Sequence, residues 1–360
     1  MGVLTNSDLH TKKVRALPQM DDMHDMPSEL DRWPQLVEPL RLCKDVIVPA
    51  FRSSDESAIR HQWAHRLLTK LAAASGTAAV LFAIVQLGYP HWLGPDLLGG
   101  TALETLEILA AFAAFTAVVL GLISSRQSNW LLERHKAERL RLAKFRFLIQ
   151  PDVWRSTGTI DPEVAEQLRH EVEKIRSLTA SDLREWVEVE GLNPTSPPDP
   201  GDTTGTAFDQ VIDYYSTKRL KVQSDFFHHR ARRHEQFDKV TRHLSPALFF
   251  GSVLAVFFHL LIKRIGDEAG PPGLELLLIV LAASLPTLGA GIRTLRLAYE
   301  FARNTSRYRA KALALDRLRE ILRQETKSWY KIKEVWYSEE SLEIEHREWC
   351  RLMLEAEWLP

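Results

Sequence analysis

The densest group of side chains that could do chemistry lies between residues 228 and 243, where histidines alternate with arginines. A metal site would need its histidines on one helical face, but the position four residues after His229 holds Arg233, and the neighbouring cations oppose a further cation. Two arginines one turn apart could instead present a fork to a phosphate. We therefore predict no metal site here and assign the binding of an anionic signal to Arg230, Arg232, Arg233 and His234. The alternative is that these cations mark one side of a membrane and pair with acidic helices such as 163–190.

A second group is acidic. Glu104 and Glu107 are one turn apart at the start of an apolar stretch, and Glu275 has the same place in a later stretch. As single residues, such acids are favoured by the partial positive charge at a helix N-terminus. Around the axis of an oligomer they would instead form rings that concentrate cations. On this second interpretation, Glu104 and Glu107 are selectivity residues of a pore.

Small and mildly polar residues form a third group. They repeat every four positions at 113–121 and at 283–291, a pattern that lets helices approach closely. The same faces could line a narrow pore with Thr116 and Thr287. Pro286 leaves a backbone carbonyl without its usual donor, so it offers a kink and hence a gate. Thr116, Pro286 and Thr287 complete the predicted pore set.

The elements that must position these side chains are apolar helices. Four stretches, each near the roughly 18–20 residues that cross a bilayer, occur in two pairs. They are Leu71–Tyr89, Ile108–Ser125, Leu244–Ile262 and Leu276–Ile292. One such stretch could be a buried helix of a soluble protein, but four in paired arrangement favour membrane spans. We predict an all-α membrane protein, with four transmembrane helices in two pairs and long cytoplasmic helical extensions.

The whole-chain composition conceals this pattern. The 360 residues carry 46 Lys+Arg and 47 Asp+Glu, and the mean hydropathy of −0.18 is that of a soluble protein. The near-neutral charge argues against a chain that reads duplex DNA. Two cysteines, Cys43 and Cys350, exclude a disulfide framework or a cysteine zinc site as the organising feature. Because the sequence has no glycine-rich phosphate loop, nucleophile elbow or HExxH motif, we predict no enzyme and no cofactor.

The basic residues orient the spans. The first connector, 90–107, contains no Lys or Arg, and the second, 263–275, contains only Lys263 and Arg264 beside the span. The flanks on the other side are rich in arginine and lysine. By the positive-inside rule both termini and the middle segment are cytoplasmic. The first residues lack the continuous apolar core of a signal peptide. We expect a multi-pass membrane protein.

The segments between the spans read as helices and one linker. A helix should end near Pro151, a second should run from Asp161-Pro162 to about Ser177, and a third should be capped by Ser181 and reach about Glu190. A long helix should start at Phe208, and a last helix should cover about 339–357. We divide the chain into an N-terminal segment, a first two-span unit, a helical insertion with its Pro/Gly linker (191–206), a second two-span unit and a C-terminal helix. Their bounds are 1–55, 56–150, 151–206, 207–335 and 336–360.

Two motifs resemble a known family. YYSTKRLKVQSDFFHHRA precedes a span pair, and an RxxAExLR pattern follows the other pair at Arg134, Ala137, Glu138, Leu140 and Arg141. With the segment Leu285–Leu313, these motifs resemble the SLATT-type transmembrane effectors of bacterial conflict systems, over residues 57–150 and 208–335. Four spans depart from the usual two, so a duplication or a related four-span effector is implied. The resemblance implies a pore-forming protein, triggered by a nucleotide-derived signal or by an associated sensor, that kills or arrests an infected cell.

We therefore predict an oligomeric ion channel of the bacterial inner membrane, with a role in antiphage defence. It would depolarise the membrane and be gated from the cytoplasm. The expected partners are membrane lipid, further copies of the chain (with a tetramer as the working number) and a nucleotide or single-stranded oligonucleotide made by a neighbouring nucleotidyltransferase. Two alternatives stay open. A non-conducting scaffold would organise cytoplasmic partners, and a transporter would need discontinuous spans with facing polar groups.

Overall fold

The structure is a computed structural model that describes residues 22–25, 27–93, 99–124, 126–154, 159–189, 196–198, 205–265 and 273–355. This part of the chain is helical and contains no strand. Four of its helices are long and apolar enough to cross a membrane. The predicted all-α fold of a membrane protein is confirmed.

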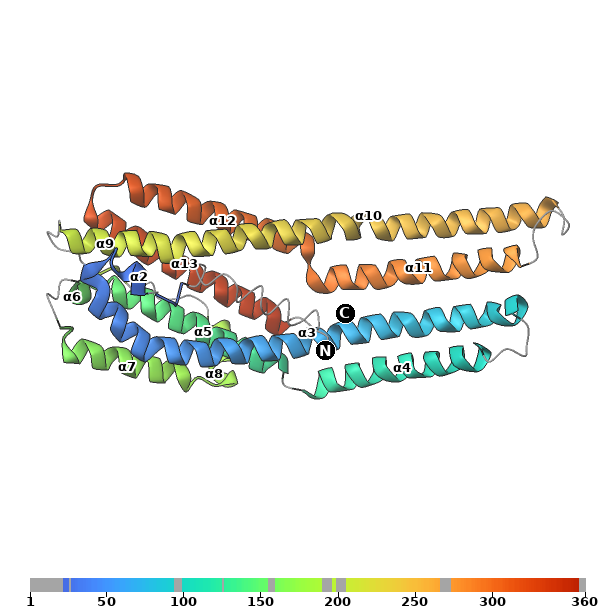
Figure 1. The fold of residues 1–360 in the computed structure, drawn as a ribbon, viewed down its shortest axis with the longest axis horizontal. Helices are drawn as coiled ribbons and strands as arrows, with labels where there is room; N and C mark the ends of the chain where they lie inside the picture. Colours follow the sequence, from blue (N-terminus) through green and yellow to red (C-terminus); the bar gives the residue numbers. More distant parts are fainter. Residues whose placement is uncertain are drawn as a thin grey trace. The chain divides into compact units, whose positions relative to one another are not determined.

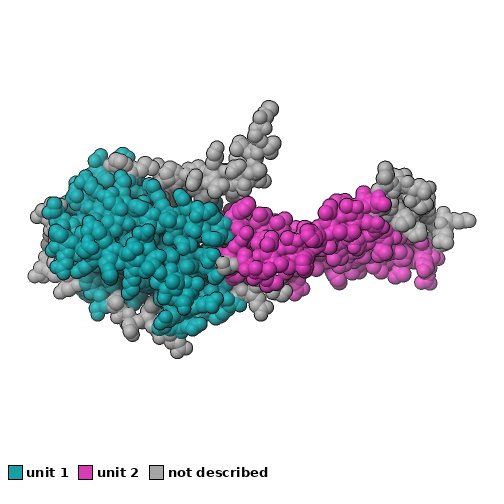
Figure 2. Space-filling view, turned by 90° about the horizontal axis from the view of Figure 1, so that it is seen from below, with its two compact units in different colours: residues 1–61, 128–230, 308–356 teal, residues 62–127, 231–307, 357–360 magenta. Residues whose placement is uncertain are grey.

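The chain divides into two compact units (Figure 2). Unit 1 comprises residues 1–61, 128–230 and 308–356, and unit 2 comprises residues 62–127, 231–307 and 357–360. The elements in chain order are α2 (Pro27–Leu30), the 3-10 helix η2 (Pro34–Leu36), α3 (Val37–Leu93), α4 (Gly99–Ile123), α5 (Arg126–Leu148), α6 (Pro151–Trp154), α7 (Pro162–Arg176), α8 (Ala180–Glu188), α9 (Thr206–Tyr214), the π-helix η3 (Tyr215–Lys221), α10 (Val222–Ile265), α11 (Leu274–Tyr299), α12 (Phe301–Gln324) and α13 (Ser328–Glu355). Of these, α3 and α10 contribute residues to both units.

Unit 2 consists mainly of two helical hairpins, in which α3 runs antiparallel to α4 and α10 runs antiparallel to α11 (Figure 1). Serine hydroxyls set the register of the second hairpin. Ser252 donates to the carbonyl of Ala282 at 2.7 Å, and Ser245 donates to the carbonyl of Gly289 at 3.1 Å. Such bonds satisfy a polar side chain inside an apolar helix pair, where no water is at hand.

A close contact between α3 and α11 joins the two hairpins. At Gly291, an added Cβ would lie 2.7 Å from Oγ1 of Thr77, so only glycine fits at this approach. Thr77 is itself held in place because its hydroxyl donates to the carbonyl of Ala73 at 2.8 Å. The predicted small-residue face at 283–291 therefore serves, at Gly291, the close approach of helices.

Unit 1 has a large core of aliphatic and aromatic side chains. Trp33, Tyr214 and Tyr215 are almost completely buried there, and Trp33 meets Tyr214 edge to face with ring centroids 5.0 Å apart. Helices from distant parts of the chain supply this core, among them α5, α9, α12 and α13. A smaller cluster joins α5, α8 and α13 around Leu131 and Cys350.

Several helix boundaries follow the predicted capping chemistry. The Asp161 side chain accepts a hydrogen bond from the Glu163 amide at 2.9 Å, and α7 begins at Pro162 as predicted. The next helix was predicted to start at Ser181, which is wrong. Thr179 caps α8 through a reciprocal capping box with Asp182.

The last helix differs more from its prediction. It begins at Ser328 and not at about Glu339, because the Glu325 carboxylate accepts the amides of Thr326 and Lys327, both at 2.9 Å, and so caps an earlier start. Helix α3 also begins early, at Val37, within the segment 1–55 that we set apart. Most of the predicted linker 191–206 lies outside the described residues.

The long helix predicted from Phe208 is present and carries Pro246 in its interior. It is interrupted by one change of winding, because η3 from Tyr215 to Lys221 is π-helical. By contrast, the helix that leaves the fourth span breaks at Glu300, whose φ of 43° lies in the left-handed region. π-Helical segments are rare and are frequent at functional sites, so η3 directs attention to the side chains around it.

Candidate functional site

The predicted acidic pore residues lie near the start of α4. Glu104 is exposed and Glu107 is half-buried on this otherwise apolar helix. Within the described residues, no ion pair joins either carboxylate to a cation. Carboxylates on the outer surface of a membrane-spanning helix are costly where they face lipid.

The other predicted pore residues, Thr116 on α4 and Pro286 and Thr287 on α11, are half-buried. The Thr287 hydroxyl donates to the carbonyl of Ala283 in its own helix at 3.0 Å, and so its polar group is satisfied without a partner on another span. Helix α11 continues through Pro286 without interruption. Within the described residues, no hydrogen bond joins the α4 set to the α11 set.

The predicted anion-binding residues all lie on α10, where Arg230 belongs to unit 1 and Arg232, Arg233 and His234 belong to unit 2. Arg232 is exposed. The other three contact aromatic rings: Arg230 lies 5.2 Å from the centroid of Phe226, Arg233 lies 5.9 Å from that of Phe237, and the His234 ring lies 5.7 Å from that of Phe301. Stacking of this kind holds a guanidinium against the ring. The anion site stays a prediction.

The most elaborate polar structure of unit 1 is a buried ionic network around η3. Arg219 donates two hydrogen bonds of 2.8 Å to the carboxylate of Glu339 on α13, and the hydroxyl of Tyr215 donates to the same carboxylate at 2.8 Å. Glu339 is completely buried, and Arg219 is 4 % exposed. A charge in such a place is tolerated only because its partner meets it with full hydrogen bonding.

Two acids from the start of the described chain extend the network. Asp22 accepts hydrogen bonds from Arg141 at 3.0 Å and from Arg219 at 3.3 Å. Asp25 accepts one from Lys144 at 3.0 Å and one from the hydroxyl of Tyr214 at 2.8 Å. Lys144 has no exposed surface, so its ammonium depends on these contacts.

The electrostatics keep the tyrosines of the network protonated. Burial, together with the neighbouring Asp25, raises the pKa of Tyr214 well above its ordinary value. Burial and Glu339 do the same to the pKa of Tyr215. Both phenols are therefore permanent hydrogen-bond donors to the carboxylates beside them.

Both motifs that carry the family resemblance contribute to this region. Tyr214, Tyr215 and Arg219 come from the YYSTKRLK segment. On α5, Glu138 forms ion pairs with Arg134 and, at 2.7 Å, with Arg141. Burial alone would raise the pKa of Glu138, but these two arginines hold that pKa well below its usual value. The motif residues thus pack and pair inside unit 1.

An ionic contact joins two of the spanning helices of unit 2. Asp238 on α10 is 5 % exposed and pairs with Arg296 of α11 at 3.0 Å and with Arg242 one turn along its own helix at 2.5 Å. This pair fixes α10 to α11 beside the apolar stretches.

A cavity of about 730 Å³ opens in unit 1 between α5, α7 and α8. Its wall combines acids with bases and rings, among them Glu163, Glu166, Arg139, Lys174, His170 and Trp186. The volume fits a small polar molecule. His135 also lines this cavity.

Sequence reasoning missed two sets of residues. The network partners Asp22, Asp25 and Glu339 gave no signal, because their basic partners are far away in sequence. The second set is His135, His346 and Cys350, the one group of metal-ligating side chains that comes together among the described residues. Here a signal was present: a histidine and a cysteine four residues apart share one face of a helix.

No protein-family model, no curated protein and no solved structure matches this sequence. The chain is therefore characterised by its own fold: an all-α protein with four helices that are long and apolar enough to cross a membrane.

Proposed function

We propose that this chain is a subunit of a homo-oligomeric ion channel, in which unit 2 conducts and unit 1 controls conduction. The observation that carries the proposal is the pair Glu104 and Glu107, since α4 presents them without an ionic partner among the described residues. Facing lipid, they would be unfavourable. Around a water-filled axis between subunits, the same carboxylates would be solvated and would attract cations.

The surface of the spans supports assembly. Only 11 % of the most apolar window is buried in three of the spanning helices, and 17 % in the fourth. Large side chains such as Phe112, Phe115 and Phe249 are more than half exposed. Lipid can cover much of this surface, but the small and acidic positions of α4 need a different neighbour, and a second copy of the chain supplies one.

The control role of unit 1 rests on the charge distribution of the sequence. By the positive-inside rule, the segments that form unit 1 lie in the cytoplasm of a bacterial cell. A nucleotide or oligonucleotide is the proposed signal. Its proposed site is the stretch of α10 that passes from unit 1 into unit 2, with Arg230, Arg232, Arg233 and His234. The role in antiphage defence rests on the resemblance to SLATT-type effectors.

The test is conduction by the purified chain in planar bilayers under a salt gradient, with and without candidate oligonucleotides. We expect cation-selective current, and in Glu104→Gln/Glu107→Gln a reversal potential shifted towards zero. The matched control is Glu163→Gln/Glu166→Gln, which removes two exposed acids at the same spacing from α7 of unit 1. This control should leave the reversal potential unchanged.

Other outcomes would separate the competing functions. Absence of current under every signal, together with stable assembly in the membrane, would contradict the channel and favour the scaffold. Substrate-coupled flux without channel current would favour a transporter, although the described parts of the spans are continuous helices. Phage challenge of cells that carry the double Gln variant then tests whether conduction is needed for protection.

A further inference from the structure

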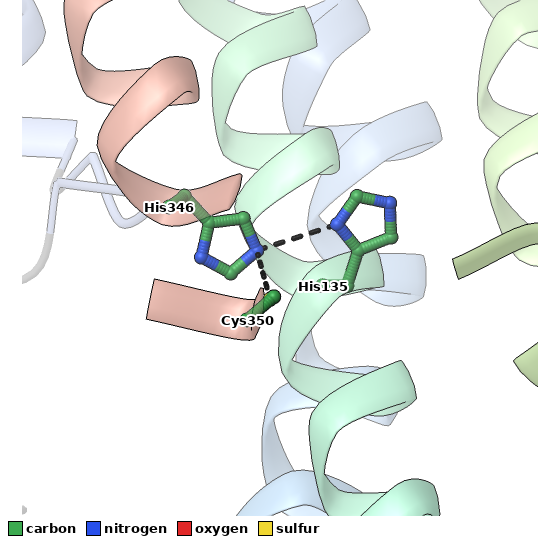
Figure 3. Close-up of side chains that lie close together, drawn as sticks. All are labelled: His135, His346 and Cys350. Carbon is green, nitrogen blue, oxygen red and sulfur yellow. Dashed lines mark hydrogen bonds between the residues drawn. The ribbon is translucent and has the colours of Figure 1, made fainter. Parts of the chain in front are cut away.

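Three metal-ligating side chains from two helices converge in unit 1. His135 belongs to α5, and His346 and Cys350 lie one turn apart on α13. Nδ1 of His135 is 3.3 Å from Nε2 of His346, which in turn is 3.6 Å from Sγ of Cys350. In Figure 3 both dashed lines meet at the same nitrogen of His346. His135 and Cys350 are buried, and His346 is partly buried.

These separations are those of ligands around one tetrahedral ion. With Zn–N bonds of about 2.05 Å and a Zn–S bond of about 2.3 Å, tetrahedral angles place two nitrogens about 3.3 Å apart and a nitrogen and a sulfur about 3.6 Å apart. Both observed distances agree. All three ligand atoms lie within 4.8 Å of one another. A small side-chain rotation would therefore bring the remaining pair, Nδ1 of His135 and Sγ of Cys350, to the same distance of about 3.6 Å.

We propose that His135, His346 and Cys350 bind a Zn²⁺ ion, with a water molecule in the fourth coordination position. The donor set, two imidazoles and one thiolate, is one that zinc prefers. The cavity of about 730 Å³ supplies the water, because His135 forms part of its wall. The ion would join α13 to α5 and so fix the last helix of unit 1. This inference is independent of the proposed channel.

The protonation states of the three side chains are compatible with the replacement of one proton by Zn²⁺. Burial lowers the pKa of His135 to about 2 and that of His346 to about 4, so both imidazoles are neutral near pH 7 and keep a lone pair. Burial raises the pKa of the Cys350 thiol to about 12. Binding therefore replaces the S–H bond by a Zn–S bond and releases one proton to solvent.

Acidic partners already neutralise the cations around the three side chains. The nearby cations already have acidic partners: Arg134 pairs with Glu138, Arg139 with Glu343 and Lys311 with Glu345. Bound Zn²⁺ and one thiolate add a single positive charge. Aromatic rings complete the shell, since Trp186 lies 4.3 Å from the ring of His135 and Trp349 lies 5.9 Å from that of His346. Such a shell limits access of water and orients the ligands.

The experiment uses the full chain in detergent, stripped with EDTA and titrated with Co²⁺ as a spectroscopic probe of the zinc site. We expect one Co²⁺ per chain, the strong visible bands of tetrahedral cobalt and a thiolate-to-cobalt charge-transfer band. Added Zn²⁺ should remove both features. Metal analysis after equilibration with Zn²⁺ should find one ion per chain.

The variants identify the ligands. Cys43→Ser is the matched control, because Cys43 is also completely buried in unit 1 and is the only other cysteine. It should keep the cobalt spectrum, whose charge-transfer band can then arise only from Cys350. Cys350→Ser and His346→Gln should lose that band and weaken Zn²⁺ binding by roughly 100-fold or more.

Failure of Cys350→Ser to fold would not affect the test, since Cys43→Ser answers the same question with Cys350 in place. The proposal is overturned if Cys43→Ser binds no Co²⁺, if its spectrum lacks the charge-transfer band, or if folded Cys350→Ser binds Zn²⁺ as tightly as the wild type. In those cases the three side chains form a hydrogen-bonded cluster only.

Discussion

The two units differ in the kind of group that each buries. Unit 1 encloses charges: Lys144 and Glu339 have no exposed surface, and Arg219 is 4 % exposed. Unit 2 leaves apolar surface uncovered, with Phe112 at 65 % and Phe115 at 66 % exposure, and its span contacts use short polar groups such as Ser252. The exposed apolar surface of unit 2 suits lipid, whereas unit 1 closes around a core that contains paired charges.

The comparison extends to how each unit defines a unique packing. In unit 1, buried ion pairs allow only one arrangement of η3, α5 and α13, because any other would leave a charge without a partner. In unit 2, the close approach at Gly291, the hydroxyl bond of Ser252 and the ion pair between Asp238 and Arg296 do this work. Substitutions at these contacts should therefore destabilise the two units for different reasons, which stability measurements can test.

The largest effect is expected in the network of unit 1. Arg219→Leu leaves the carboxylate of Glu339 buried without its main partner, so the free energy of unfolding should fall by about 3–5 kcal/mol. Chemical denaturation in detergent measures this free energy, with the susceptibility of unit 1 to proteolysis as the signal for unfolding. The double variant Arg219→Leu/Glu339→Leu removes both charges and should recover part of the loss. If the double variant were as unstable as the sum of the two single variants, burial of an unpaired charge would not be the cause.

Glu138 gives a smaller effect with a distinct pH dependence. Its folded pKa lies well below the usual 4.5, so its ionisation stabilises the folded state above that value, and this stabilisation is lost as the pH falls through 4.5 towards the lower folded pKa. Glu138→Gln should lower the free energy of unfolding at pH 7 by about 1.5–3 kcal/mol.

Melting curves at a series of pH values check this. Below the usual pKa, the melting temperature of the wild type should fall more steeply than that of Glu138→Gln. Glu173→Gln is the control, because Glu173 pairs with Arg176 at the exposed surface of α7 and contributes little. Parallel pH profiles for all three proteins would contradict the role of Glu138.

The sequence predicts the spans of unit 2 better than the buried network of unit 1. The spans could be predicted because membrane crossing depends on local composition, as in Leu71–Tyr89, which has no charge. The cap at Asp161-Pro162 was local too. The network was not predictable, because Arg219 looks like an exposed helix cation until the fold brings Asp22 and Glu339, distant in sequence, beside it. Nothing in the sequence indicated the π-helical winding of η3 either.

The candidate sites show this limit as well. Glu104 and Glu107 were noticed because acids in an apolar stretch are unusual, and the structure places them at the surface of α4. His135 was not noticed, because its partners His346 and Cys350 lie on a helix more distant in the chain. A pattern within one helix can be read from the sequence, whereas a site shared by two helices needs the fold.

In unit 2, Gly291→Ala should lower the free energy of unfolding by about 1–3 kcal/mol, since the added Cβ would lie 2.7 Å from the Thr77 hydroxyl. Gly76→Ala is the matched control: it is also a span glycine, and its Cβ would meet Ala114 at an ordinary 4.0 Å. The double variant Gly291→Ala/Thr77→Ala should restore stability. Resistance to denaturation in detergent measures the stability of all three variants. If Gly76→Ala and Gly291→Ala lost the same stability, the close approach of Gly291 to Thr77 would not be the cause of the loss.

The smallest effect is expected at Ser252, which tests whether hydroxyl bonds hold the hairpin of α10 and α11 as ion pairs hold unit 1. Ser252→Ala removes the 2.7 Å bond to the Ala282 carbonyl and should cost about 0.6 kcal/mol, because bonds between membrane helices are weak individually. Ser306→Ala is the control, because its hydroxyl bonds within its own helix, to Ala302. A loss of stability at Ser252 as large as that of Arg219→Leu would mean that one hydroxyl bond matters to unit 2 as much as the ionic network matters to unit 1. The contrast between the two units would then no longer hold.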